Sequence, residues 1–360
     1  MLYKKCCVTI TDYVGPTSMP FNEFVLWRRT HRPEEKQVVI LLFKTTKDNN
    51  VLLPEDVDLF VVGKSIRQLR YVIRQLCQCY SQLYFHIHEG KSVLFFSMAT
   101  LLRYRRRTVY TLHSTYRNYP FHNKLFSFCA SLLSQYVVCV SKTSYKYYPD
   151  VLKKLKKQHA MFIQNGVDIE RIALVESYQK RIERPFTMVY VARLVPLKRH
   201  YLLLKALQNL PNVKLKLIGK GFLENELKRQ TLELGLLQRV DFMGLLPRDD
   251  VYRELKNADL YVSASSYEGL PIGVLEAMGC GVPCLVSNIE QHREIAEKCQ
   301  SLFLCRDDVN EWERNIYDIA SLSSEKRSCI GSNGMREIEQ YFSLTSMHEK
   351  YDILYYSINH

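Results

Sequence analysis

The chain has 360 residues, of which 47% are hydrophobic and 24% are charged. This composition describes a globular protein of about two domains, and it excludes both a wholly disordered chain and a small scaffold held together by disulfides or metals. The net charge of +13 comes from the first half, because residues 1–165 hold 25 Lys and Arg against 10 Asp and Glu and the remainder holds 25 against 27. This asymmetry indicates two domains with different duties, and the basic half suits an anionic partner.

The predicted elements alternate between strand and helix along the first half of the chain. Strands are predicted at 6–10, 38–43, 59–62, 83–87, 108–112 and 136–140, and helices at 67–80, 91–104 and 121–134. The alternation then restarts, with strands at 187–191, 214–218, 240–242, 260–263 and 283–287 and helices at 200–209, 223–234, 249–257 and 271–278. Such alternation is typical of parallel sheets covered by helices on both faces.

The two series meet near the Asn165-Gly166 turn, which follows a lysine-rich stretch at 153–157. We therefore expect an N-terminal domain over 1–165 and a C-terminal domain over 166–339, with a helix at 340–360 that packs back on the first domain. Two doubly wound domains that face each other across a cleft would bring the carboxyl ends of both sheets to one ligand site.

The compartment is predicted from cysteines and from apolar runs. The eleven cysteines are scattered without a pair of CxxC elements, so we expect no structural zinc site and a reducing environment. No secretory signal opens the chain and no uncharged run approaches the length of a membrane span. These features predict a cytoplasmic protein that can touch a membrane surface.

The most informative segment is YEGLPIGVLEAMGCGVP at 267–283. Pro271 suits the first position of a helix, so Glu268 would lie in the loop before it and Glu276 about one and a half turns inside it. The free amides at such a helix start form an anion site, and we expect them at Leu270, Ile272 and Gly273. Gly269 and Gly273 would let a ligand approach the backbone. An ordinary strand-to-helix turn with exposed glutamates is the alternative interpretation.

Two cations lie in another loop that follows a strand. Arg193 and Lys198 come after the strand at 187–191, and their spacing suits a diphosphate, although solvated loop charges are the plainer interpretation. Gly219 and Gly221 follow the next strand, and Gly244 follows the one after it. Each strand thus ends in a glycine or a charge, as expected of a doubly wound ligand-binding domain.

These elements together carry a family resemblance over residues 160–300. They are FIQNGVD (162–168), VARLVPLK (191–198), IGKG (218–221), FMGLLP (242–247), ADLYVSAS (258–265) and EGLPIGVLEAMGCGVP (268–283). Their order and spacing resemble the retaining, GT-B-fold glycosyltransferases of family 4. The resemblance implies an α/β protein with the GT-B fold, whose second domain binds a nucleotide sugar.

The resemblance also implies roles for individual donor-site residues. Arg193 and Lys198 would hold the donor diphosphate, and Glu276 would hold the ribose. Glu268, together with the backbone from Gly269 to Gly273, would lie against the donor sugar. The backbone at Gly244 and Leu245 would meet the base.

The first domain resembles the family more loosely. His113, in TVYTLHSTY, matches the family's histidine near the reacting sugar, whereas His86 and His88 match a strand that we interpret as mainly structural. Ser141 matches a strand-end serine with a structural or phosphate-side role. The first loop of the family holds a glycine pair near the donor phosphates, and here only Gly15 can serve.

The implied reaction moves a hexosyl or N-acetylhexosaminyl group from a nucleoside diphosphate, with UDP expected, to a hydroxyl of a glycan or a lipid-linked acceptor in cell-surface polysaccharide synthesis. It proceeds with retention at the anomeric carbon and requires no cofactor. Because the sequence has no strand-end Asp-x-Asp motif, we expect fixed cations to replace a metal. A GT-B epimerase or phosphorylase is one alternative, and a nucleic-acid-binding protein is the other; we expect no nucleic-acid partner.

The basic first half has its own predicted partner. Arg67, Arg70 and Arg74 recur at helical spacing beside Leu69, Ile73 and Leu76. This pattern predicts a basic amphipathic helix that meets the anionic inner face of a membrane, with a solvated helix face as the alternative.

Overall fold

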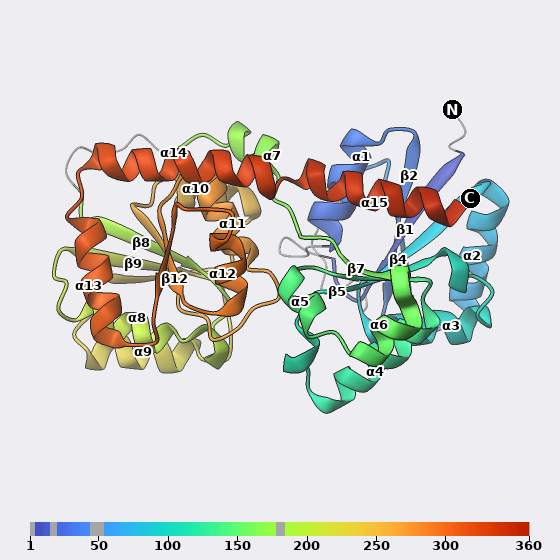
Figure 1. Cartoon of the computed structure of the whole chain (residues 1–360), viewed down its shortest axis with the longest axis horizontal. Helices are drawn as coiled ribbons and strands as arrows, with labels where there is room; N and C mark the ends of the chain where they lie inside the picture. The colour runs from blue at the N-terminus through green and yellow to red at the C-terminus, as the bar shows by residue number, and fades with distance from the viewer. Residues whose placement is uncertain (1–3, 15–19, 44–53, 178–183, 360) are drawn as a thin grey trace. The chain divides into compact units, whose positions relative to one another are not determined.

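The computed structural model describes residues 4–14, 20–43, 54–177 and 184–359 (Figure 1). The chain divides into two compact units. Unit 1 comprises Met1–Asn165 and Leu344–His360, and unit 2 comprises Gly166–Ser343. The boundary between them falls in the Asn165-Gly166 turn.

Unit 1 is built on a parallel sheet of seven strands in the order β3-β2-β1-β4-β5-β6-β7. The strands are β1 Lys5–Thr11, β2 Glu35–Leu42, β3 Asp58–Gly63, β4 Gln82–Ile87, β5 Thr108–Leu112, β6 Tyr136–Cys139 and β7 Ala160–Phe162. Because β1 and β4 are adjacent, the chain order reverses between them, and this is the point where doubly wound sheets bind ligands.

Helices cover both faces of this sheet. They are the π-helix η1 Pro20–Leu26, α1 Trp27–His31, α2 Ile66–Cys79, α3 Gly90–Thr100, α4 Phe121–Leu133, α5 Lys142–Lys146, α6 Asp150–Lys156 and α15 Leu344–Asn359, with short 3₁₀ turns η3 Arg105–Arg107, η4 Tyr116–Asn118 and η5 Lys157–His159. One apolar core includes residues of α2, α3, α4 and α6, and a second includes residues of α1 and α15. The layers follow from strands that are apolar on both sides.

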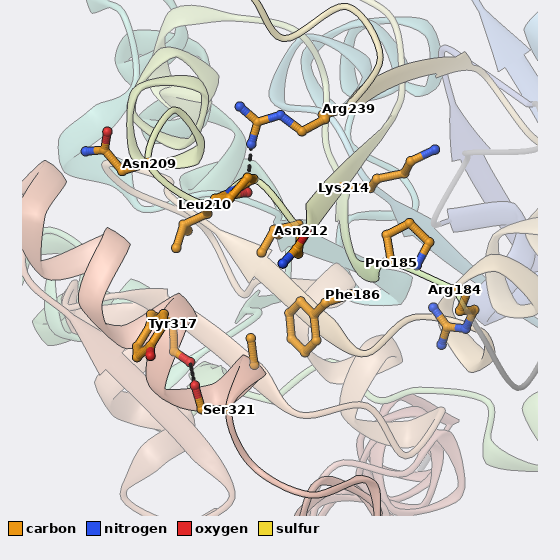
Figure 2. Close-up of a pocket in the computed structure, with 13 residues that line it drawn as sticks. Arg184, Pro185, Phe186, Asn209, Leu210, Asn212, Lys214, Arg239, Tyr317 and Ser321 are labelled. Carbon is orange, nitrogen blue, oxygen red and sulfur yellow. Dashed lines mark hydrogen bonds between the residues drawn. The ribbon is translucent and has the colours of Figure 1, made fainter.

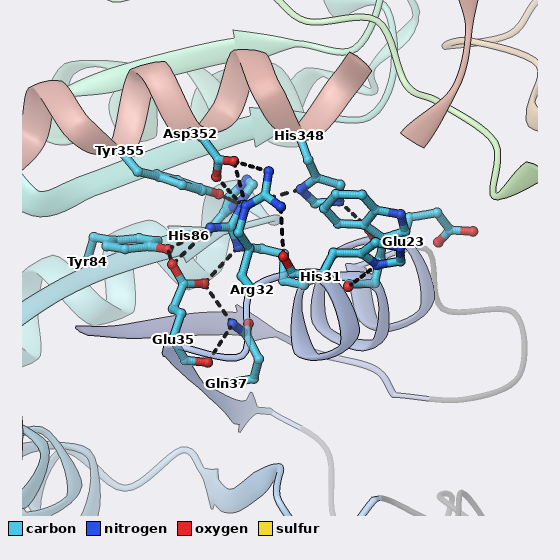
Figure 3. A network of polar contacts seen from close by, with 12 residues as sticks. Glu23, His31, Arg32, Glu35, Gln37, Tyr84, His86, His348, Asp352 and Tyr355 are labelled. Atoms are coloured by element: carbon cyan, nitrogen blue, oxygen red, sulfur yellow. Dashed lines mark hydrogen bonds and ion pairs between the residues drawn. The ribbon is translucent and has the colours of Figure 1, made fainter. Parts of the chain in front are cut away.

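A polar network attaches α15 to α1 and β2 (Figure 3). Arg28 is buried and donates to both carboxylate oxygens of Glu35, at 2.8 and 2.9 Å, and to Oδ1 of Asp352 at 2.7 Å. The indole ring of Trp27 stacks on His348 of α15 at 4.1 Å between ring centroids. Removing one partner of a buried ion pair leaves an uncompensated charge, so these contacts make α15 an integral part of unit 1.

Unit 2 repeats the architecture with a parallel six-stranded sheet in the order β10-β9-β8-β11-β12-β13. The strands are β8 Phe186–Val191, β9 Val213–Ile218, β10 Val240–Gly244, β11 Leu260–Ser263, β12 Cys284–Ser287 and β13 Leu302–Cys305. The helices are α7 Ile169–Leu174, the 3₁₀ turn η6 Pro196–Lys198, α8 His200–Leu207, α9 Glu224–Glu233, α10 Arg248–Lys256, α11 Ile272–Gly279, α12 Glu290–Ala296, α13 Val309–Ala320 and α14 Ser324–Tyr341. The adjacent strands β8 and β11 are the switch point of this sheet.

Two helix boundaries differ from the sequence expectation. The helix expected over 91–104 ends at Thr100, because Leu101 and Leu102 both adopt positive φ, at 49° and 61°. The helical segment expected at the end of the chain is interrupted at buried Phe342, whose carbonyl accepts a hydrogen bond of 2.8 Å from the Val167 amide. α14 therefore belongs to unit 2 and α15 to unit 1.

The prediction that the helix at 67–80 presents an apolar face to a membrane is wrong. Leu69, Ile73 and Leu76 of α2 are buried in the unit 1 core, so they are not available to a lipid surface. Arg67 and Arg74 are exposed. Among the described helices, none has the length and apolarity needed to cross a membrane.

Candidate functional site

The loop after β8 is held in place by a close backbone contact with the loop after β9. The Leu194 amide donates to the Lys220 carbonyl at 3.1 Å, and a Cβ at Gly219 or Gly221 would lie only 2.0 or 2.1 Å from the carbonyl oxygen of Ala192 or Leu194. Both glycines are thus required for packing. The predicted glycine pair positions the loop that carries Arg193, whose side chain is exposed.

Lys198 and Glu268 come together at this edge of the sheet. Lys198 ends η6 and pairs with Oε1 of Glu268, and both side chains are largely buried. Arg199 has a φ of 48° and donates to the carbonyls of Ala264 and Ser265, which ties η6 to the loop that carries Glu268. The site therefore presents a fixed cation beside a carboxylate.

The start of α11 lies against the end of β8. A Cβ at Gly273 would lie 2.7 Å from the Tyr261 hydroxyl and 3.4 Å from the Val191 carbonyl oxygen, so glycine allows this approach. Pro271 occupies the N-cap position, so α11 begins at Ile272, one residue later than predicted. The prediction of a free amide at Ile272 is wrong, because that amide donates to the Leu270 carbonyl at 3.0 Å.

The remaining helix-start amides keep their donor capacity. Within the described chain, the amides of Leu270 and Gly273 have no acceptor. Unpaired donors at a helix start, beside a cation after β8, favour binding of an anion at this edge.

Glu276 is a buried carboxylate held from α10. Tyr252 donates its hydroxyl to Oε1 of Glu276 at 3.0 Å, and the Arg248 guanidinium lies 3.2 Å from the same oxygen. Both contacts fall on Oε1, which leaves Oε2 for another donor. Neither Arg248 nor Tyr252 was predicted from the sequence, although an arginine at the start of a helix that follows a strand-end turn is a signal that could have indicated Arg248.

The expected base-side residues lie at the end of β10. Gly244 has a φ of 68°, and its carbonyl accepts a hydrogen bond of 2.8 Å from the Gly219 amide, whereas the Leu245 side chain is exposed. This turn therefore adjoins the glycine loop after β9. Gly15 lies outside the described residues.

A cavity of about 880 Å³ lies at the opposite edge of the same sheet, where β8 and β9 begin (Figure 2). Two of its cations are already engaged: Arg184 pairs with Asp259, and Arg239 donates to the carbonyls of Leu207 and Leu210. It contains none of the predicted donor-site residues.

His113 of unit 1 follows β5 and is held by a second histidine. Its Nε2 lies 2.8 Å from Nδ1 of His88, and the His86 ring stacks on His88 at 4.2 Å. His86 in turn bonds the hydroxyls of Thr111 and Tyr355, at 2.7 and 2.6 Å. Burial lowers the pKa of His113 to about 4, so its imidazole is neutral at pH 7.

His113 also lines a cavity of about 410 Å³ at the carboxyl edge of the unit 1 sheet, together with Asp12, Glu89 and Phe126. Ser141 is buried and accepts a hydrogen bond from the Ser144 amide, which caps α5. The structure thus gives Ser141 a structural role and places His113 at a cavity. Glu89 was not singled out from the sequence.

Two family models match adjacent parts of this chain. Residues 31–171 match the model described as Glycosyltransferase Family 4, and residues 176–336 match Glycosyl transferases group 1. Together they cover most of the sequence. The chain belongs to the family 4 glycosyltransferases.

Curated relatives of this glycosyltransferase share part of its length. The UDP-Gal:alpha-D-GlcNAc-diphosphoundecaprenol alpha-1,3-galactosyltransferase of Escherichia coli is 29% identical over 54% of this chain and 53% of its own length. A GDP-mannose-dependent phosphatidylinositol monomannoside mannosyltransferase of Corynebacterium glutamicum is 25% identical over 61% of this chain and 59% of its own. The chain thus matches a little over half the length of these two relatives.

Solved structures share the fold at low identity. Sucrose-phosphate synthase from Thermosynechococcus elongatus superimposes with a TM-score of 0.79 and 15% identity, over 98% of this chain and 99% of that chain. The Anabaena protein HepE, in complex with UDP-glucose, gives a TM-score of 0.75 and 20% identity, over 98% and 99%. Two parallel α/β sheets and these neighbours establish the GT-B fold.

Proposed function

We propose that the protein transfers a hexosyl or N-acetylhexosaminyl group from a nucleoside diphosphate to a hydroxyl of a glycan or lipid-linked acceptor. The proposed nucleoside diphosphate is UDP, and the transfer proceeds with retention at the anomeric carbon. The observation that carries the proposal is the convergence at one edge of the unit 2 sheet of Lys198, Arg193 and the amides that start α11. The galactosyltransferase relative, named for UDP-Gal, and HepE, solved with UDP-glucose, support UDP as the carrier.

The proposed chemistry follows from where charge develops. As the glycosidic bond to the diphosphate breaks, negative charge grows on the β-phosphate, and donors fixed beforehand at that position stabilise the transition state more than the ground state. Lys198, held by Glu268, and the Gly273 amide are such donors. We assign Glu276 to the ribose through Oε2, and His113 to the reacting sugar.

We also propose that transfer needs no divalent metal, because fixed cations supply the positive charge at the phosphates. Support comes from the Lys198 side chain, which is 15% exposed and held in place before any ligand binds. Activity that survives EDTA is expected, and loss of turnover in EDTA that returns with Mg²⁺ or Mn²⁺ would overturn this part of the proposal.

The test of the function is a donor panel. Thermal shift with UDP, GDP and their sugars identifies the carrier, and incubation of the selected donor with octyl glycosides follows, with proton NMR of the anomeric centre in the product. A new glycoside with the donor's anomeric configuration is expected. A product with the inverted anomeric configuration would indicate an inverting transferase. Epimerised donor without a glycoside would indicate an epimerase, and a product formed only from sugar 1-phosphate would indicate a phosphorylase.

We further propose that unit 1 docks on an anionic membrane, through what we call the arginine-leucine surface. This surface comprises the exposed side chains of Arg74, Met98, Leu101, Leu102, Arg103, Arg105 and Arg106. The Leu101 side chain is 78% exposed. Positive φ at a residue with a side chain costs about 1–2 kcal/mol, so the turn holds two leucines outward at an energetic cost.

Contacts between α2 and the turn make this surface continuous. Arg70 donates to the Ala99 carbonyl at 2.6 Å and Cys77 to the Tyr104 hydroxyl at 3.2 Å, so Arg74, which lies between them on α2, faces the same turn. Between Asp58 and Asp150 the only acidic residue is Glu89, which lines a cavity. Exposed apolar side chains surrounded by arginines favour binding to an anionic lipid surface.

Flotation with vesicles of phosphatidylcholine, with and without phosphatidylglycerol, tests the docking. The wild type is expected to float only with the anionic vesicles and to be released by high salt. Leu101→Asn combined with Leu102→Asn keeps residues that tolerate positive φ and is expected to abolish flotation. Leu174→Asn, at an exposed leucine of unit 2, is the matched control. Equal flotation of wild type and double variant would contradict the proposed surface.

A further inference from the structure

Two histidines follow adjacent strands of the unit 1 sheet. His88 comes directly after β4 and His113 directly after β5, and these two strands pair in parallel. Nδ1 of His88 lies 2.8 Å from Nε2 of His113, which is hydrogen-bond distance. Both residues line the cavity at this edge of the sheet. The contact occupies one ring nitrogen of His113, so only its Nδ1 remains for a ligand.

The His88 ring has little freedom to turn. It is buried, the His86 ring stacks on it at 4.2 Å between centroids, and the Phe24 ring lies edge to face with it at 5.2 Å. His86 is itself held at both nitrogens, by the hydroxyls of Tyr355 and Thr111. The nitrogen that His88 offers to His113 is therefore fixed in position by packing.

Both rings of this pair are neutral at pH 7. Burial, with smaller contributions from His86 and His113, lowers the pKa of His88 well below its usual range, and burial lowers the pKa of His113 to about 4. A neutral imidazole carries one proton, which lies on one of its two nitrogens. At the contact, therefore, only one of the two facing nitrogens is protonated, either Nδ1 of His88 or Nε2 of His113.

The other nitrogen of His88 distinguishes the two arrangements. Nε2 of His88 is buried and has no hydrogen-bond partner among the described residues. With His113 as the donor, the proton of His88 would lie on this Nε2, which would be a buried N–H without an acceptor. With His88 as the donor, Nε2 carries no proton. Buried N–H groups without an acceptor are rarer in proteins than acceptors that lack a donor, so a proton on Nδ1 of His88 is favoured.

We propose that His88 is a positioning residue that donates from Nδ1 to Nε2 of His113, so that His113 keeps its own proton on Nδ1 and presents an N–H donor to a sugar oxygen. The proposal rests on the proposed function, which places His113 at the reacting sugar. In this tautomer neither nitrogen of His113 is free to accept a proton, whereas a general base needs a free nitrogen. His113 thus orients the sugar and does not deprotonate the acceptor hydroxyl.

Nitrogen NMR of the full chain with isotope-labelled histidine measures the tautomer directly. Protonated and bare ring nitrogens differ widely in chemical shift, and a spectrum of His113→Gln assigns the signals of His113 among the ten histidines. At pH 7 and without ligand, His113 is expected to carry its proton on Nδ1 and to have a bare Nε2. A proton on Nε2 of His113 in the wild type would overturn the proposal.

Two substitutions of His88 separate its hydrogen bond from its packing. His88→Asn places an amide N–H near the position of Nδ1, so it is expected to preserve the His113 tautomer and most of the turnover. His88→Phe keeps a ring to stack on His86 but cannot donate. It is expected to shift His113 toward the tautomer with the proton on Nε2 and to lower kcat at least tenfold, with the thermal shift by UDP unchanged.

His122→Phe is the matched control, because His122 is an exposed histidine of α4 that does not line the cavity. It should change neither the His113 tautomer nor kcat. An equal loss of kcat in His88→Asn and His88→Phe, with the wild-type tautomer retained in both, would show that His88 acts by packing alone and would overturn its positioning role. The tautomers of the wild type and of His88→Asn decide the proposal even where His88→Phe fails to fold.

Failure of this proposal is distinguishable from failure of the proposed function, because the tautomer is measured in the free protein. UDP binding and a glycoside product, with the His113 proton on Nε2, would overturn the role of His88 alone. The expected tautomer without a UDP shift or a glycoside product would overturn the proposed function, and with it the sugar as the partner of His113.

Discussion

Lys198 and Glu268 form an ion pair between two loops that are 70 residues apart in sequence. The pair joins the loop after β8 to the loop that precedes α11, and both side chains are about 15% exposed. A carboxylate beside the cation keeps Lys198 in one place before any anion arrives. A phosphate at this edge would therefore meet a charge that is already positioned.

The first prediction concerns this cation. Lys198→Ala is expected to reduce turnover at least tenfold, equivalent to about 1.4 kcal/mol of lost transition-state stabilisation. Arg193→Ala is expected to have an effect in the same direction. Steady-state kinetics with the selected donor measures both. Lys205→Ala, an exposed lysine of α8, serves as control and should retain wild-type rates. Wild-type turnover in folded Lys198→Ala would refute the assignment.

The second prediction concerns Glu276 and Arg248, the residue that positions its carboxylate. Glu276→Ala removes the proposed ribose contact, so the KM for the donor is expected to rise at least tenfold. Arg248→Ala leaves the carboxylate in place but releases its orientation, which is expected to give a smaller rise in KM. Arg248→Lys should restore part of the loss, because a cation still faces Oε1. A larger effect of Arg248→Ala than of Glu276→Ala would argue against a positioning role.

Gly221 provides a third prediction. An alanine there would place its Cβ 2.1 Å from the Leu194 carbonyl oxygen, so the loop that carries Arg193 must shift. We expect Gly221→Ala to lower unfolding stability by about 1–3 kcal/mol and to weaken UDP binding. Gly235→Ala is the control, because a Cβ added at Gly235, whose φ is 68°, has no atom within 4 Å and so displaces no neighbour. It is expected to lower the Tm without changing UDP affinity in isothermal titration.

Buried histidines give a fourth prediction, about acid stability. Burial, with a smaller contribution from Lys198, lowers the pKa of His200 to about 4, and burial lowers the pKa of His113 and His292 to about 4 as well. Between pH 6.5 and 4 the unfolded chain binds protons that these folded residues do not bind. Stability contributed by the neutral histidines is therefore present above about pH 6.5 and is lost as the pH falls.

Scanning calorimetry between pH 7.5 and 4.5 measures this loss, with the Tm expected to fall throughout the acid range. His200→Phe offers a residue-level check, because both ring nitrogens of His200 are buried without a hydrogen-bond partner in the described structure. The variant keeps an aromatic ring and removes the titration, so its Tm should fall less than that of the wild type. An identical pH dependence in both proteins would exclude His200 as a contributor.

Much of the unit 2 site was predictable because its signals are local. Arg193 and Lys198 lie within one loop after an apolar run, and Glu268 and Glu276 flank one helix start. A glycine or a charge after each strand marks the carboxyl edge of a parallel sheet without knowledge of the tertiary structure. The Ile272 amide was mispredicted because its acceptor, the Leu270 carbonyl, depends on the turn geometry at Pro271.

The α2 helix shows the opposite limit. Its arginines and leucines alternate as in a membrane-surface helix, and the same periodicity describes a helix that packs its apolar face on a sheet. The structure decided between the two by placing Leu69 and Ile73 in the core. The apolar part of the proposed membrane surface lies instead at Leu101 and Leu102, where positive φ ends α3, and helical periodicity does not predict that change in backbone direction.

The sequence alone determined the division of charge, the strand–helix alternation and the motif residues at the carboxyl edge of the second sheet, because each depends on neighbours within one element or one loop. The tertiary structure decided which distant groups meet. Strand order brings β8 beside β11 and so joins Lys198 to Glu268, α10 supplies Arg248 to Glu276, and α4 packs on the start of α3 beside Glu89. These contacts depend on the packing of elements far apart in the chain, and local periodicity carries no record of that packing.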